Sequence, residues 1–266
     1  MILTQRERFK EIADSIRLKT GETGKIKPVD FAEKIAGIYT DAGNWDSVQA
    51  NGYRRDYSYA FANTAYKTLN PSYDIICEKC VYMFMNAQEI TSLSNIVINI
   101  ISSNPNMSYL CMGCINLINA PVMEFDYSAA TAVRTWVSAF ANCVSLENVG
   151  IYLGTGQQNP VSVRNNMANC FFKCKKIKNL TFSGVGSPIN LDLSYIEDIS
   201  TESLESLSGC LMDVSGADSG VYEIIINNDQ QSKLSENRAD GITLYDIMTQ
   251  KGWSFVIKER EDANEE

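Results

Sequence analysis

The chain opens with hydrophobic positions at helical spacing. Phe9, Ile12 and Ile16 recur every three or four residues among Arg, Lys and Glu side chains, which is the pattern of an amphipathic helix. Thr4 and Glu7 precede them at the spacing of a capping box, in which a hydroxyl and a carboxylate each satisfy a free backbone N–H group. The pattern predicts a helix over this segment.

A second hydrophobic stripe follows after two glycines. Phe31, Ile35 and Ile38 again recur at helical spacing, and Pro28 suits the first turn of the helix that they predict. Two helices of this size bury too little apolar surface to be stable alone. We therefore predict that residues 1–40 form a two-helix segment that docks onto a partner protein. A simple cap on the domain that follows is the alternative.

A short phrase recurs beyond residues 41–52, which are rich in Gly, Asp and Asn and predict a hinge. Most copies have a large residue, a variable residue, then Asn, Gly or Lys and a small residue, with Leu or Ile three positions later. The copies start at residues 61, 84, 111, 140 and 171, with a weaker one at 207. Periods of roughly 20–50 residues indicate repeated units that stack on one another.

Each copy predicts one structural unit, made of a short helical turn, a bend and a strand that begins near the Leu. Candidate strands lie at residues 96–100, 149–153 and 180–182. One unit cannot bury its own apolar face, so we expect consecutive units to stack and to align their strands into a sheet. The predicted buried positions of this body, residues 53–189, are Phe61, Phe84, Cys114, Phe140, Cys143, Phe171 and Cys174.

Residues 190–258 predict a different unit, which caps the stack. Its helices and strands follow from apolar spacing and from residues that favour helix ends. They are a helix N-capped by Ser200, a strand at 223–227, a helix around Leu244 and Met248 that Gly252 ends, and a strand at 253–257. Residues 259–266 are acidic and predict a frayed tail.

Composition narrows the classes of function. The 266 residues are 45% hydrophobic, enough for a core, and carry a net charge of −9. An acidic protein repels phosphate backbones, so we expect no nucleic acid partner. No apolar run reaches the ~20 residues of a membrane-spanning helix, so we expect no membrane insertion. The charged N-terminus lacks the apolar core of a signal peptide, which predicts synthesis in a cytoplasm.

The chain has eight Cys and no His. The absence of His excludes His-based catalytic triads and His-containing zinc sites. Cys77 and Cys80, together with Cys111 and Cys114, have the spacing of a four-Cys zinc site. Cys114 also takes the small buried position of the repeat, where a free Cys packs as a small hydrophobe. We therefore interpret the cysteines as core residues and expect no metal or cofactor, with zinc as the alternative.

Two further groups are candidates for chemistry or recognition. Glu124 and Asp126 lie on one face of a candidate strand, and a pair of carboxylates can hydrolyse glycosidic bonds. In a protein with 32 acidic residues, a solvated surface role is the simpler interpretation. Tyr53, Tyr57 and Tyr59 alternate along the chain and form the candidate receptor surface, because aromatic side chains anchor interfaces at low entropic cost.

Several segments resemble known families. Residues 60–64 (AFANT), 139–146 (AFANCVSL) and 170–177 (CFFKCKKI) resemble the core phrase of BspA-type leucine-rich repeats, Ala-Phe-x-x-Cys-x-x-Leu. That family occurs in bacterial and protozoan surface proteins and in phage tail proteins. Residues 9–21 and 27–35 resemble a helix pair common in phage tail and fibre proteins. Residues 191–194, 201–204 and 251–253 resemble the closing segment of such tail proteins.

These resemblances imply an α/β protein, an irregular leucine-rich-repeat solenoid with a short N-terminal helical anchor. The function that they imply is that of a non-enzymatic structural protein of a bacteriophage tail, baseplate or fibre, which presents its repeats for host attachment. Expected partners are other virion proteins through residues 1–40, further copies of the chain, and a host surface glycan or protein. The alternatives are a virion-associated polysaccharide depolymerase and a bacterial surface adhesin. Irregular repeats without a signal peptide or wall anchor weaken the adhesin interpretation.

Overall fold

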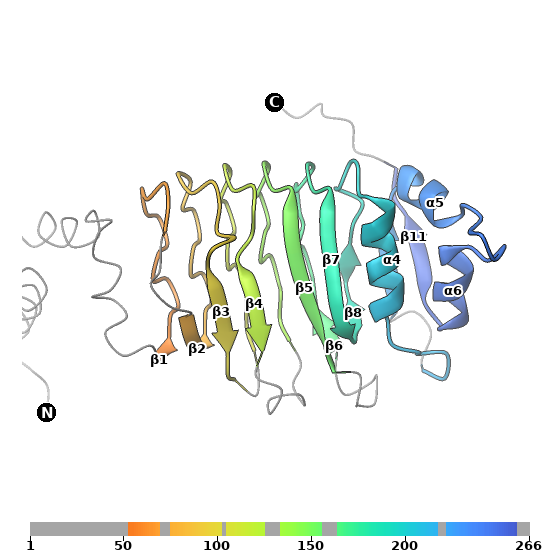
Figure 1. Ribbon diagram of the computed structural model, residues 1–266, viewed down its shortest axis with the longest axis horizontal. Coiled ribbons are helices and arrows are strands. Elements are labelled where there is room, and N and C mark those ends of the chain that lie inside the picture. The colour runs from red at the N-terminus through yellow and green to blue at the C-terminus, as the bar shows by residue number, and fades with distance from the viewer. Residues whose placement is uncertain are drawn as a thin grey trace, which may run out of the picture.

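The structure is a computed structural model that describes residues 53–69, 75–102, 105–125, 134–155, 164–217 and 222–259. Within these ranges the protein is a mixed α/β protein with many short parallel strands in small sheets and three helices (Figure 1). Several predicted segments lie outside the described residues: the hinge at 41–52, the tail from residue 260, and the docking positions Phe9, Ile12, Ile16, Phe31, Ile35 and Ile38.

Strands from successive units lie side by side along the long axis of the molecule (Figure 1). They form two parallel sheets, β1-β2-β3-β4 and β5-β7, and β6 and β8 pair separately. The bounds are β1 Tyr53–Asp56, β2 Ile75–Lys79, β3 Val97–Ile100, β4 Val122–Phe125, β5 Asn148–Thr155, β6 Arg164–Asn166, β7 Asn179–Val185 and β8 Ser187–Ile189. The strands predicted at 96–100, 149–153 and 180–182 are thus confirmed as β3, β5 and β7.

The recurring phrase folds as a series of hydrogen-bonded turns. The prediction of a short helical turn in each copy was therefore wrong. In the second copy, the N–H groups of Met83, Met85 and Ala87 each donate to the carbonyl three residues earlier, at 3.0–3.2 Å. Tyr82 and Asn86 have φ of 58° and 56°, the sign that the third residue of a type II turn requires. A right-handed helix needs a negative φ at every residue, which these two positions lack.

We call these stretches the turn segments; they are residues 57–64, 80–87, 107–114, 136–143 and 167–174. Backbone hydrogen bonds join each one to the next. Phe61 N–H and Asn63 N–H donate to the carbonyls of Met83 and Met85 in the second segment, both at 2.8 Å. The same pattern recurs at the next three junctions. Alternate residues therefore satisfy their N–H groups in the following unit, which fixes the register between units.

Large side chains at the first position of the phrase pack in a buried column. The rings of Phe61 and Phe84 stack with centroids 5.3 Å apart, and those of Phe140 and Phe171 lie 6.1 Å apart. Cys111 takes the corresponding position between the two pairs and is also fully buried. Burial of each large apolar side chain contributes about 1.5–3 kcal/mol. The column therefore links consecutive units through shared apolar contact.

Small side chains form a second buried column. The thiols of Cys114, Cys143 and Cys174 each donate to a backbone carbonyl in the preceding unit, at 3.0, 3.0 and 2.9 Å. Burial raises the pKa of the Cys143 thiol above its ordinary value of 9.0 and raises that of Cys174 to about 12. The thiols of Cys143 and Cys174 therefore stay protonated and act as structural donors.

The C-terminal unit consists of the three helices and a parallel sheet in the order β11-β10-β9. Its elements are β9 Leu191–Asp192, α4 Thr201–Cys210, β10 Glu223–Ile226, α5 Asn228–Leu234, α6 Leu244–Gln250 and β11 Ser254–Ile257. Ser200 is the N-cap of α4, as predicted, and its hydroxyl accepts a hydrogen bond from Ser203 N–H at 3.2 Å. None of the described helices combines the length and the hydrophobicity needed to cross a bilayer.

Candidate functional site: a hollow on the exposed sheet face

The row of strands is interrupted between β4 and β5. Asn119 and Asn148 form a parallel bridge, and Ala120 N–H donates to the Asn148 carbonyl at 3.0 Å. Beyond this point β4 and β5 belong to different sheets. In a regular parallel ladder the next N–H group to face β5 would be that of Val122, but it donates to the Ile96 carbonyl on the other side, at 2.9 Å. The ladder to β5 therefore ends after Ala120.

A change in the inward-facing positions keeps the two strands apart. After Asn148, the first, third and fifth residues are buried. After Asn119, the first and second residues are buried, and the inward positions then fall on the fourth and sixth. The unit of β4 thus contains one extra residue, as in a β-bulge. Because side chains alternate between the faces of a strand, continued pairing would turn apolar residues toward solvent.

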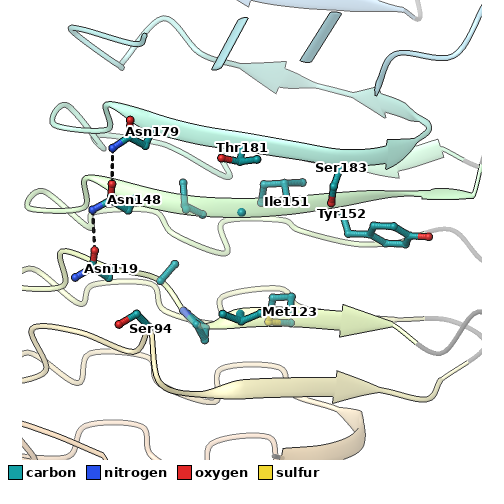
Figure 2. A pocket seen from close by; sticks show the side chains of 14 residues that line it. Ser94, Asn119, Met123, Asn148, Ile151, Tyr152, Asn179, Thr181 and Ser183 are labelled. Carbon is teal, nitrogen blue, oxygen red and sulfur yellow. Dashed lines mark hydrogen bonds between the residues drawn. The ribbon is translucent and has the colours of Figure 1, made fainter. Parts of the chain in front are cut away.

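The separation leaves a hollow of about 380 Å³ on the exposed face of β4, β5 and β7 (Figure 2). Gly150 lines it without a side chain, and a Cβ placed there would meet nothing within 4 Å. Among the described residues, none of the lining side chains is acidic or basic. The lining residues with side-chain amide or aliphatic hydroxyl groups are Ser94, Asn119, Asn148, Asn179, Thr181 and Ser183.

Asparagine side chains form a hydrogen-bonded ladder at one end of the hollow (Figure 2). The side-chain amide of Asn179 donates to Oδ1 of Asn148 at 2.6 Å, and the amide of Asn148 donates to Oδ1 of Asn119 at 2.7 Å. The amide of Asn119 in turn reaches the Ser92 hydroxyl at 3.2 Å. Each amide retains a second N–H and a second acceptor lone pair. The asparagine ladder therefore holds donors and acceptors in fixed positions.

Tyr152 lies at the opposite end of the hollow from the asparagine ladder (Figure 2). Its ring stacks on Phe125, with centroids 5.3 Å apart. The guanidinium of Arg134 lies 5.1 Å from the Tyr152 ring centroid and 5.2 Å from that of Phe125. Arg134 is 1% exposed, and burial lowers the pKa of its guanidinium. These contacts fix the orientation of the tyrosine ring and keep the positive charge away from solvent.

The structure separates the three tyrosines that we predicted as a receptor surface. Tyr59 is 57% exposed, whereas Tyr57 is 1% exposed and belongs to the core. The prediction is wrong for Tyr57 because this residue opens the first turn segment, in the inward position that Cys80 takes in the second. Tyr53 begins β1, and its side chain lies outside the described part of the chain.

Sequence reasoning missed a column of stacked tyrosine rings on the turn segments. The ring of Tyr82 lies between those of Tyr59 and Tyr109, with centroids 4.7 and 4.6 Å away and interplanar angles of 11° and 2°. All three residues have φ close to 60°. Loss of hydration and the neighbouring phenols raise the pKa of Tyr82 above 10. Each tyrosine stands two residues before the large residue of its phrase, which was the signal in the sequence.

The sequence offered two candidate chemical sites, a pair of carboxylates and two Cys-x-x-Cys pairs. Glu124 lies exposed in β4, and Asp126 lies outside the described residues. The four cysteines of the two Cys-x-x-Cys pairs are all fully buried. In the described ranges, no group of three or more Cys, Asp or Glu residues is placed to hold a metal ion.

No family model, curated protein or solved structure matches the chain. Its function must be inferred from its own surface. In the part of the chain that the structure describes, the fold builds three features at the surface: the hollow, the asparagine ladder and the stacked tyrosines.

Proposed function

We propose that the protein is a non-catalytic attachment protein of a bacteriophage virion, located in the tail, baseplate or fibre. In this proposal the sheet face of residues 53–189 contacts the host surface, and residues 1–40 dock onto other virion proteins. The observation that carries it is the hollow on the exposed sheet face. Its described lining offers fixed amides, aliphatic hydroxyls and one tyrosine, but no carboxylate, Lys or Cys to serve as a general base beside them.

We further propose that residues 53–189 form an irregular leucine-rich-repeat solenoid of the BspA type. Three features support this proposal: the backbone hydrogen bonds between consecutive turn segments, the buried column that includes Phe61 and Phe84, and the parallel strands. Repeat proteins use such stacks to build extended binding surfaces from side chains that recur once in each unit. The asparagine ladder and the stacked tyrosines are such side chains.

The assignment to a virion is supported by the resemblance of both ends of the chain to phage tail proteins. The hydrophobic stripes of residues 1–40 suit a docking segment that is stable when a partner covers it. Tail components follow the symmetry of the particle, so the chain would assemble as a homo-oligomer with copies related by that symmetry.

The proposal is tested on particles purified from a lysate of the bacterium that carries the gene. Peptides of the chain should be found by mass spectrometry in the particle band of a density gradient. Replacing Phe9, Ile12 and Ile16 by Ser should remove the chain from the particles, whereas replacing Lys10 and Lys19 by Ser should not. Detection of the chain in the host envelope and not in particles would overturn the virion assignment.

Attachment is tested separately, by competition. Purified full-length protein added to host cells should slow adsorption of the phage in proportion to the amount of bound protein. Unchanged adsorption at saturating protein would overturn the attachment role and leave an architectural role in the particle.

A further inference from the structure

The hollow between β4 and β5 has a chemistry that differs from the rest of the protein. The chain carries a net charge of −9, yet the described lining of the hollow holds no charged side chain. The nearest buried cation, Arg134, is 1% exposed behind the Tyr152 and Phe125 rings and cannot reach a ligand on the surface. An anionic ligand would therefore find no cation to offset the loss of its hydration. The lining favours an uncharged ligand.

The polar groups of the hollow are amides and hydroxyls that both donate and accept. Asn148 uses one N–H and one lone pair in the asparagine ladder and keeps the others. Thr181 and Ser183 are exposed on β7, on the same face. Because each group can donate and accept, together they match the hydroxyls of a sugar, which donate and accept in the same way.

The remaining wall of the hollow is apolar. Val122 is 44% exposed, and the half-buried ring of Tyr152 also belongs to the lining. A pyranose ring has one face of C–H groups that packs against such surfaces while its hydroxyls point to the rim. An aromatic ring fixed in advance, as Tyr152 is by Phe125 and Arg134, binds with little further loss of conformational entropy.

We propose that this hollow binds an uncharged, hydroxyl-rich saccharide, with a sugar ring against Tyr152 and Val122 and its hydroxyls on Asn148, Thr181 and Ser183. A volume of about 380 Å³ lies at the lower end of the range for small-ligand sites, which suits about one or two rings of a longer glycan. This inference rests on the proposed attachment role, for which it names the ligand class and the site.

The glycine in the hollow provides a matched test. A Cβ at Gly150 or at Gly216, in the C-terminal unit, would meet nothing within 4 Å, and φ at both positions lies outside the left-handed region. Gly150→Leu should fill the hollow, while Gly216→Leu makes the same change away from it. Full-length protein is titrated with neutral di- and trisaccharides of glucose, galactose, mannose and N-acetylglucosamine, with sulfated and sialylated sugars as charged probes, by saturation-transfer NMR.

A neutral saccharide should bind to the unsubstituted chain and to Gly216→Leu with the same affinity. Binding should be at least about tenfold weaker in Gly150→Leu and in Tyr152→Ala. Binding that Gly150→Leu leaves unchanged, preference for the charged probes, or no binding by any neutral probe while host peptides bind would each overturn the proposal.

The outcomes also separate this inference from the attachment role. If the protein competes with phage adsorption but Gly150→Leu competes equally well, the site assigned here is wrong and the attachment role stands. If neutral saccharides bind in the hollow but the chain is absent from particles, the virion assignment is wrong and the saccharide site stands.

Discussion

Asn179 donates a hydrogen bond from its side-chain amide to the side-chain oxygen of Asn148, at 2.6 Å across the pair of strands β7 and β5. The two residues are 31 positions apart, and nothing in their local sequences requires them to meet. The contact exists because the units stack in register. It is therefore a sensitive probe of that register and of the face that carries the hollow.

The asparagine ladder should contribute to stability unequally along its length. Asn148 makes two ladder bonds and Asn179 makes one. At about 0.5–1 kcal/mol for each partly exposed hydrogen bond, Asn148→Ala should cost about 1–2 kcal/mol and Asn179→Ala about half of that. Urea unfolding measures both changes. Equal costs for the two substitutions would contradict a ladder in which the central residue serves two neighbours.

Among the stacked tyrosines, replacing Tyr82 by glycine should destabilise the protein less than replacing it by alanine. Tyr82 has φ of 58°, a conformation that costs about 1–2 kcal/mol for a residue with a Cβ. Tyr82→Ala loses two ring contacts and keeps this strain, whereas Tyr82→Gly loses the contacts and relieves it. The Gly variant should therefore be more stable than the Ala variant by about 1 kcal/mol in urea unfolding. An Ala variant as stable as the Gly variant would show that φ at this position is negative.

The buried thiols should make the fold sensitive to alkaline pH. Burial raises the pKa of Cys174 from 9.0 to about 12, so the folded protein holds this proton more tightly than the unfolded chain. The resulting stabilisation is fully present below pH 9 and is lost as pH rises from 9 toward 12. In Cys174→Ala, the free energy of unfolding should fall less steeply over this window, by up to about 1.4 kcal/mol per pH unit. Parallel pH curves for the two proteins would exclude this linkage.

Two glycines of the C-terminal unit should respond to alanine in opposite directions. Gly252 has φ of 87°, and a Cβ there would lie 2.6 Å from the backbone of Ser215. Gly252→Ala should therefore destabilise the protein by about 2 kcal/mol or more. Gly209 lies in α4, and a Cβ there would meet nothing within 4 Å, so Gly209→Ala should stabilise by about 0.5–1 kcal/mol. Calorimetric melting temperatures should move down and up, respectively.

The spacing of apolar residues within short segments was sufficient to predict most of the longer strands. Strands β3, β5, β7, β10 and β11 lie at or within a few residues of their predicted places, because alternating apolar residues specify a half-buried strand wherever it packs. The helix α5 was missed, although Asn227 and Gln230 have capping-box spacing and form both capping hydrogen bonds. Its short, polar sequence offered no apolar stripe.

The turn segments show where local reasoning fails. A helical turn and the observed series of hydrogen-bonded turns place the same large and small residues inward, so the apolar pattern does not distinguish them. The difference lies in the sign of φ at residues such as Tyr82 and Lys173, which rarely adopt the left-handed region. Hydrogen bonds to the neighbouring unit stabilise this conformation, and no local rule includes them.

The sequence alone determined the buried large and small positions of the recurring phrase, such as Phe84 and Cys143, because these positions recur from copy to copy. Only the tertiary structure decided what those units build together: the asparagine ladder, the stacked tyrosines, and the hollow that opens where the unit of β4 contains one extra residue. The physical reason is that these features depend on register between residues more than 20 positions apart. That register is set by backbone hydrogen bonds across units, which apolar periodicity does not encode.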